Sequence, residues 1–333
     1  MKEEDQLRWN AILDRMNFSV TPDTEHTLSF GDQRAVVSPW GGSLRRYFVV
    51  GADGSERDIV WGYSGGSHKK GGQGDVLIPF PGRIPQGRYA FAGETFQLEL
   101  NDKEGPNAIH GFVRTQPWRC SLNTMNEVAY RVDVDEATYG SKGYPFSLAI
   151  QIRYRLDENS LSCTFEIENA GRRAAPVGAG FHPYFTVGTT LIDEAVLRLP
   201  CAGLVEFSDR LLPTGKILSV EGTEWDYRAA RPIGGRRFNH CYVQLERDTD
   251  GIAVASLSHA ASGRTIEVVM DRSFSSVVVY SGEAITSQAR RALAIEPMTC
   301  ATDAFNHPEW GLAVLDPGQR FTGRYTVRYR VDA

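Results

Sequence analysis

Hydrophobic and polar residues alternate along most of the chain with a period of two. The clearest stretch is LAIQIRYRLDENSLSCTFEIEN, residues 148–169, where apolar residues occupy every second position on both sides of DENS. Successive side chains of a β-strand point to opposite faces, so this alternation is typical of strands with one buried face, and DENS is typical of a turn. The stretch therefore predicts a β-hairpin with one face in the core.

Similar segments, separated by turn residues, follow one another along the chain. The clearest are FQLEL (96–100), AYRVDVD (129–135), TIEVVMD (265–271), SSVVVYSG (275–282) and GRYTVRYRV (323–331). Ten or more such strands predict an all-β fold in which two large antiparallel sheets pack face to face. Helical periodicity is scarce, and Leu7, Ile12, Leu13 and Met16 predict only one or two amphipathic turns near the N-terminus.

No linker or shift in composition divides the sequence. We therefore expect one domain over residues 1–333, with residues 1–25 as an N-terminal extension of uncertain structure. The hydrophobic share of 41%, the charged share of 23% and the net charge of −5 are ordinary for a globular protein, and the basic residues are scattered. These values argue against a nucleic-acid partner.

The N-terminus lacks the apolar stretch of a secretory signal, and no apolar run is long enough to span a membrane. We therefore expect a cytoplasmic protein with no membrane partner, either a monomer or a homodimer. The five cysteines are far apart, odd in number and without a CxxC pair, which argues against a disulfide framework or a zinc ribbon. We expect them to be reduced and mostly buried.

Three residues stand out as candidates for chemistry. His110 in NAIHGF and His182 in GAGFHPYFTVG lie among glycines and aromatic residues, which is common in sugar pockets, although a core histidine bonded to a carbonyl is the more frequent explanation. Glu296 in RALAIEPMTCATDAF ends an apolar strand. Its carboxylate is either a paired structural acid or a group whose pKa burial raises toward the range of a general base.

A stiff loop adds a candidate cation. IPFPGRIPQGRYAF, residues 78–91, holds three prolines, two glycines and two arginines. Pro81 and Pro85 restrict the backbone around Arg83, and Gly82 allows a tight turn beside it. Trp118 in NAIHGFVRTQPW could offer an apolar face to a sugar, and packing in the core explains it equally well.

Several motifs together resemble the aldose 1-epimerase (galactose mutarotase) family from about residue 30 to the C-terminus. They are IPFPGRIPQGRYAFAGETFQLELN, NAIHGFVRTQPW, GYPFSL, GAGFHPYF, DRLLPTGKI, WDYRAARPIG and AIEPMTCATDAFN, in the family's order and spacing. The resemblance implies a β-supersandwich whose site needs neither metal nor cofactor. It also implies a reaction that interconverts the α and β anomers of a free sugar.

The resemblance assigns roles residue by residue. Glu296 matches the family's catalytic base and His182 its catalytic acid, while Arg83 and His110 match positions that hold the sugar. One position departs from the family: RFNHCY places Asn239 where many members carry an aspartate that contacts sugar hydroxyls. An amide keeps hydrogen bonding but loses charge, so this substrate-binding position bears on which sugar is used.

Three functions follow as expectations. The first is an aldose 1-epimerase acting on a free or modified hexose. The second is a mutarotase for an anionic sugar such as sulfoquinovose or a hexuronate, which Asn239 and the arginines Arg83, Arg88 and Arg114 would suit. The third is a sugar-binding protein that has kept the fold without turnover, since a fold does not fix a function.

Overall fold

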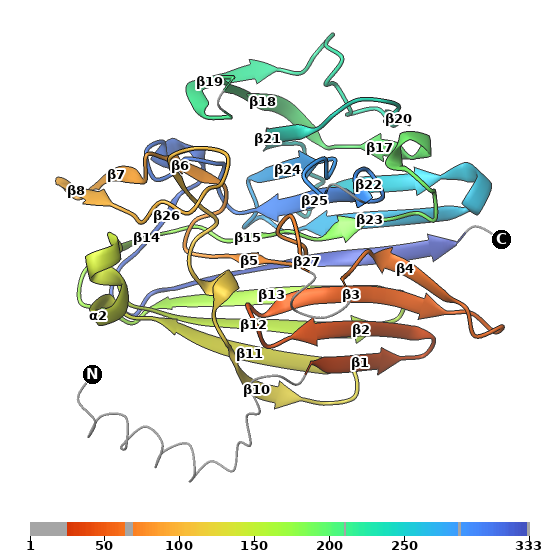
Figure 1. Cartoon of the computed structure of the whole chain (residues 1–333), viewed down its shortest axis with the longest axis horizontal. Coiled ribbons are helices and arrows are strands. Elements are labelled where there is room, and N and C mark those ends of the chain that lie inside the picture. Colours follow the sequence, from red (N-terminus) through yellow and green to blue (C-terminus); the bar gives the residue numbers. More distant parts are fainter. Residues whose placement is uncertain (1–24, 64–68, 210, 286–287, 332–333) are drawn as a thin grey trace.

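Two large antiparallel sheets form the body of the computed structural model, which describes residues 25–63, 69–209, 211–285 and 288–331 (Figure 1). Sheet A has twelve strands within these ranges, and β15 (Gly180–Phe181) pairs with its strand β25 and with β5 (Val76–Leu77). The other strands of sheet A are, in spatial order, β1 (His26–Phe30), β2 (Gln33–Ser38), β3 (Ser43–Val50), β4 (Glu56–Val60), β16 (Tyr184–Phe185), β25 (Leu293–Met298), β24 (Ser276–Tyr280), β21 (Asn239–Leu245), β18 (Cys201–Phe207) and β19 (Pro213–Ser219).

Sheet B has nine strands in the same described ranges. In spatial order they are β10 (Arg119–Asn123), β11 (Glu127–Val134), β12 (Leu148–Asp157), β13 (Ser160–Asn169), β27 (Arg320–Val331), β23 (Arg264–Met270), β22 (Ala253–His259), β17 (Val196–Arg198) and β20 (Arg231–Pro232). Buried side chains from both sheets form one continuous cluster, so the core lies between the two inner faces. The predicted all-β fold with two large sheets is confirmed.

Smaller elements complete the described part of the chain. Three two-stranded sheets pair β6 (Arg83–Pro85) with β9 (Asn107–Ile109), β7 (Arg88–Phe91) with β8 (Glu94–Gln97), and β14 (Ala175–Val177) with β26 (Ala313–Leu315). The helices are the α-helix α2 (Glu136–Tyr139) and the 3-10 helices Val113–Thr115, Gly140–Lys142, Ile192–Glu194, Ala260–Ser262 and Pro308–Trp310. Among the described residues, no helix is long and apolar enough to cross a membrane.

The hairpin predicted from the alternating sequence is β12–β13. Ile150 pairs with Ile167 and Ile152 with Phe165, and all four side chains are buried. The segment FQLEL differs from the prediction, because β8 ends at Gln97. Gln97 pairs with Arg88, the first residue of the partner strand β7, so the β7–β8 ladder ends at Gln97. The chain then leaves this small sheet and does not join a large one.

Other expectations are settled by burial. Trp118 is buried in the core and donates its indole N–H to the carbonyl of Val113 at 3.0 Å, so the packing alternative holds. All five cysteines are free, and Cys120 is the one that is only partly buried. The helical turns expected around residues 7–16 lie outside the described residues.

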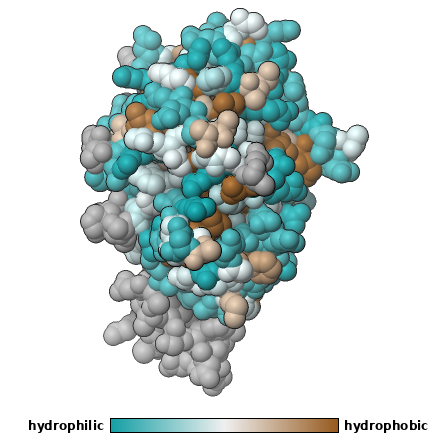
Figure 2. Space-filling view, turned by 90° about the vertical axis from the view of Figure 1, so that its right-hand side faces the viewer, coloured by the Kyte–Doolittle hydropathy of each residue, from teal (hydrophilic) through white to brown (hydrophobic). Residues whose placement is uncertain are grey.

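On the face shown in Figure 2, apolar side chains of the described residues lie in small patches between hydrophilic ones, which is normal for a protein surface.

Candidate functional site

The register of sheet A places Glu296 on the floor of a cleft. Glu296 of β25 lies beside Val278 of β24, which lies beside Cys241 of β21. The neighbouring residues Val279 and Ile295 belong to the core shared with sheet B, so Glu296 and Val278 face the opposite side of sheet A. Loops cover this side, and the Glu296 side chain is 2% exposed.

Asn239 belongs to the next row on the same face. It pairs with Tyr280, which pairs with Ala294, two residues before Glu296. Both Asn239 and Tyr280 are partly exposed and line the cleft. The position singled out by the sequence therefore lies two strands away from the buried carboxyl group.

His182 follows β15 and precedes β16, the neighbours of β25 in sheet A. Its backbone N–H donates to the carbonyl of Asp75 at 3.0 Å, and its carbonyl accepts from the N–H of Gly74 at 2.9 Å. Its ring stacks on Tyr184 with centroids 5.1 Å apart. Gly72 closes the other side, because an added Cβ would lie 2.8 Å from Cδ2 of His182. The imidazole is thus held on two faces.

His182 and Glu296 are in direct contact. Nε2 of His182 lies 3.3 Å from Oε1 of Glu296. Burial raises the pKa of the Glu296 carboxyl well above its usual range, although the Arg83 charge lowers it. Burial also lowers the pKa of the His182 imidazole to about 3. Burial therefore favours the uncharged form of each group, which places their shared proton on Glu296 rather than on His182.

A short β-ladder fixes the backbone of Arg83, and two carboxylates orient its guanidinium. Arg83 pairs with Ile109 in the β6–β9 ladder, and its backbone N–H donates to Oγ1 of Thr302 at 2.9 Å. Its Nε donates to Asp102 at 2.8 Å and its NH2 to Glu104 at 2.5 Å. The two carboxylates bind the guanidinium through Nε and NH2, and NH1 has no hydrogen-bond partner among the described residues.

The position of the His110 ring is fixed by two hydrogen bonds to the backbone of Gly82. His110 has a left-handed φ of 65°, its N–H donates to the carbonyl of Gly82 at 3.0 Å, and its Nδ1 accepts from the N–H of Gly82 at 3.2 Å. Because Nδ1 accepts, the ring proton is on Nε2. Burial first, and then the charges of neighbouring cations, lower the pKa of His110 well below its usual range. His110 is therefore a neutral donor, with its ring 5.8 Å from that of His182.

All five residues singled out by the sequence line one cavity of about 300 Å³. They are Arg83, His110, His182, Asn239 and Glu296. Within the described residues, no cluster of three or more His, Cys, Asp or Glu side chains is arranged to hold a metal ion. The cavity is small and polar, with uncharged proton-transfer groups at its base and a guanidinium at its side, an arrangement suited to acid–base chemistry on a hydroxylated molecule.

The comparison with protein families is consistent with this geometry. The model of the family described as aldose 1-epimerase matches residues 25–328. The chain belongs to the aldose 1-epimerase family. The galactose mutarotase of Mus musculus is 26% identical, over 90% of this chain and 92% of its own. The uncharacterized protein YihR of Escherichia coli K12 is 32% identical, over 70% of this chain and 71% of its own.

Solved structures share the fold of this aldose 1-epimerase family member. A GalM/aldose epimerase homologue from C. elegans has a TM-score of 0.83 at 19% identity, covering 93% of this chain and all of its own. The galactose 1-epimerase of Lactobacillus acidophilus has a TM-score of 0.75 at 18% identity, covering 92% and 94%. These likenesses confirm the galactose mutarotase-like fold expected from the motifs.

Sequence reasoning missed several residues of the site. Asp102 and Glu104 lie in the polar segment NDKEG, which reads as an exposed turn and carries no signal of a link to Arg83. Asp75 directly precedes the apolar run VLIPF. It could therefore have been identified as an acid at the edge of a buried strand. It is buried and pairs with Lys69 and with Arg114, which also lines the cleft. Arg88 is exposed on β7 and does not line the cavity.

Proposed function

We propose that this protein is an aldose 1-epimerase that interconverts the α and β anomers of a free hexose. The observation that carries the proposal is the buried contact between His182 and Glu296, 3.3 Å apart at the base of a polar cleft. In a cyclic aldose O1 and O5 are bonded to the same carbon. Two proton-transfer groups side by side can therefore reach both oxygens at once.

Ring opening needs one proton to leave O1 and one to reach O5. The pair holds one transferable proton, either as a carboxylic acid with a neutral imidazole or as a carboxylate with an imidazolium, so its proton count suits the step. With Glu296 as base and His182 as acid, Glu296 takes the O1 proton, His182 protonates O5, the C1–O5 bond breaks and C1=O1 forms. The aldehyde turns about C1–C2, and reclosure returns both protons.

The proton must first pass from Glu296 to His182 when the sugar binds. Two features favour the carboxylate form of Glu296: the positive charge of Arg83, which already lowers its pKa, and a hydrogen bond from the O1 hydroxyl. His110 would donate its Nε2–H to a sugar oxygen, and the free NH1 of Arg83 would do the same. Such groups stabilise negative charge that develops on oxygen during ring opening and closure.

Anomer exchange measured by NMR tests the proposal. Purified protein is added to equilibrated glucose, galactose and a hexuronate, and magnetisation transfer between the two anomeric protons is recorded. A saturable acceleration supports the epimerase. Sugar binding without acceleration would instead support a protein that binds sugars and does not turn them over.

A second candidate, favoured by one observation, is a mutarotase for a sugar with an acidic group at C6. C6 is attached to C5, next to O5, so such a group would lie on the His182 side of the cleft. Arg114 lines that side, and its buried Nε has no hydrogen-bond partner in the described chain. Lys69, Arg114 and Asp75 together carry a net charge of one positive unit. Faster exchange of glucuronate than of glucose would favour this candidate, and the reverse order would remove it.

A further inference from the structure

Tyr184 lies next to the His182–Glu296 pair without reaching the cleft. On the β16–β25 ladder it lies opposite Ala294, two residues before Glu296. Its ring stacks on the His182 ring, with the centroids 5.1 Å apart and the planes at 18°. Tyr184 is fully buried and does not line the cleft. This one residue is therefore fixed to the strand that carries Glu296 and is packed against His182.

Packing has to orient the His182 ring. Its Nε2 lies 3.3 Å from Glu296, and its Nδ1 has no hydrogen-bond partner in the described chain. A functional histidine is commonly oriented by a hydrogen bond at its second nitrogen, which is missing here among the described residues. The two faces of the ring are held instead, by Tyr184 on one side and Gly72 on the other.

The Tyr184 hydroxyl group connects these two sides. It donates to the carbonyl of Gly71 at 2.6 Å. Gly71 and Gly72 have left-handed φ values of 55° and 74°. An added Cβ would lie 3.0 Å from the Tyr184 hydroxyl at Gly71 and 2.8 Å from Cδ2 of His182 at Gly72. Each glycine therefore packs against one of the two stacked rings, and the hydrogen bond holds the glycine pair against the imidazole.

Two further features keep this arrangement in place. Pro183 lies between His182 and Tyr184 in the sequence, and its fixed φ limits how the two rings can turn relative to each other. Burial raises the pKa of the Tyr184 hydroxyl well above its usual range, so the hydroxyl stays a donor at the pH of any ordinary assay. The hydrogen bond to Gly71 is therefore not lost through titration.

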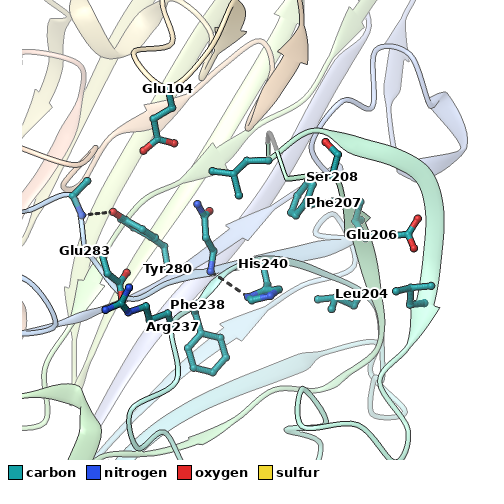
Figure 3. Close-up of a pocket in the computed structure, with 15 residues that line it drawn as sticks. Glu104, Leu204, Glu206, Phe207, Ser208, Arg237, Phe238, His240, Tyr280 and Glu283 are labelled. Carbon is teal, nitrogen blue, oxygen red and sulfur yellow. Dashed lines mark hydrogen bonds between the residues drawn. The ribbon is translucent and has the colours of Figure 1, made fainter.

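The neighbouring Tyr280 differs from Tyr184 in its access to ligands. The two rings meet edge to face with centroids 6.4 Å apart. The Tyr280 hydroxyl accepts from the N–H of Ala284 at 2.7 Å, and both residues line the cleft and a second cavity of about 720 Å³ beside it (Figure 3). Tyr184 lines neither cavity, so it does not touch a molecule bound in either one.

We infer that Tyr184 is a positioning residue for His182, whose ring and hydroxyl group together hold the imidazole against Gly72 with Nε2 facing Glu296. The effect on rate rests on the proposed epimerase function, whereas the effect on the imidazole does not. An imidazole free to turn about its Cβ–Cγ bond would spend part of its time with Nε2 out of hydrogen-bond reach of its partners. Proton transfer requires that reach.

Tyr184→Phe tests the inference, because it removes the hydrogen bond to Gly71 and keeps the stacked ring. We expect kcat for anomer exchange to fall about tenfold, since a slight misplacement of a catalytic group is costly, with KM unchanged. Tyr154→Phe is the matched control on β12 of sheet B. Tyr154 is also buried, and its hydroxyl donates to the carbonyl of Gly42, another left-handed glycine, at 3.0 Å. Equal kcat values in the two variants, at equal loss of Tm, would overturn the inference and leave the epimerase standing.

Gly71→Ala acts on the same contact from the other side and decides the matter if Tyr184→Phe does not fold. Its added Cβ would press on the Tyr184 hydroxyl, and we expect a similar fall in kcat. Gly31→Ala is the control, because Gly31 has a φ of 56° against 55° for Gly71 and no atom within 4 Å of an added Cβ. Equal kcat values in these two variants would likewise overturn the inference.

NMR of the His182 imidazole gives a readout that does not need turnover. Protein labelled with 15N-histidine shows the ring nitrogens, and His182→Gln identifies which signals belong to this residue. A looser ring admits water, so the pKa of His182, lowered by burial to about 3, should rise toward its usual value in Tyr184→Phe. The charged and titratable groups around it are unchanged in that variant: Glu296, His110, Lys69, Arg114 and Asp75.

This readout separates the inference from the epimerase proposal. In a protein that exchanges no sugar, altered His182 signals in Tyr184→Phe would still support the positioning role. His182 signals and a His182 pKa identical to those of the unsubstituted protein would overturn it, whether or not the protein is an epimerase.

Discussion

Nε2 of His182 lies 3.3 Å from Oε1 of Glu296, and the other polar atom of each side chain, Nδ1 and Oε2, has no hydrogen-bond partner in the described chain. Buried polar atoms without partners are rare in proteins and carry a cost in stability. Here all four atoms belong to two groups at the base of an open cleft.

Glu296→Gln should abolish enzymatic anomer exchange while the protein stays folded. The amide has the shape of the acid but cannot take or give the proton, so we expect a loss of about 10²–10⁴-fold in kcat. NMR exchange measures this, and circular dichroism with thermal unfolding checks the fold. Glu267→Gln is the control, since it removes a partly exposed carboxylate, paired with Arg330 on sheet B and outside the cleft. Activity retained in Glu296→Gln would refute the role of Glu296 as base.

The pH dependence of kcat/KM should show a broad plateau around neutrality. The pair is active when it holds one transferable proton. It gains a second proton only as pH falls toward the lowered His182 pKa of about 3, and it loses its single proton as pH rises through the raised Glu296 pKa. Activity should therefore persist well below pH 6.5, where an ordinary histidine titrates. An acid limb centred near 6.5, in protein shown by circular dichroism to be folded, would contradict this assignment.

The sequence predicted the elements whose signal is local. The alternation in residues 148–169 is complete within one hairpin, so strand, turn and buried face could all be predicted. Glu296 was found because it directly follows an apolar run. The expectation that the strand ends there was wrong, because β25 continues past it to Met298. The galactose mutarotase-like fold came from the resemblance of several motifs and not from alternation, which indicates strands without their spatial order.

The contacts of the site could not be predicted in the same way. His182 meets Glu296 because β15 and β16 pair with β25, more than a hundred residues further along the chain. The carboxylates that orient Arg83 come from a segment with the composition of a solvent-exposed turn. The pairing of β18 with β21 stops at Leu204 and Tyr242, and no alternation of side chains encodes that point.

Asp102→Asn should impair the site through Arg83. Asp102 accepts from Nε of Arg83 at 2.8 Å, and losing this charge-assisted bond should lower kcat/KM about tenfold. Removing a negative charge beside Arg83 also leaves more positive potential at Glu296. The pKa of Glu296 should fall, and the alkaline limb of the pH profile should move to lower pH.

Asp133→Asn is the matched control for Asp102→Asn, because Asp133 pairs with Arg119 on the exposed side of sheet B. We expect neither its rate nor its profile to change, since exposed ion pairs contribute little. A purely structural role for Asp102 would lower the rate without moving the alkaline limb, and that result would rule out electrostatic coupling to Glu296.

Gly72→Ala should show whether kcat depends on the position of the His182 imidazole, apart from any loss in stability of the fold. Gly72 has a φ of +74°, and an added Cβ would lie 2.8 Å from Cδ2 of His182. Gly54→Ala is the control, because Gly54 has a φ of +78° with no atom within 4 Å of an added Cβ. Both variants should lose about 1 kcal/mol from the left-handed backbone. Only Gly72→Ala should displace the imidazole and lower kcat by at least about tenfold, since proton transfer requires hydrogen-bond reach. Equal kcat values in the two variants, at equal loss of Tm, would show that the packing of Gly72 against His182 does not position the acid.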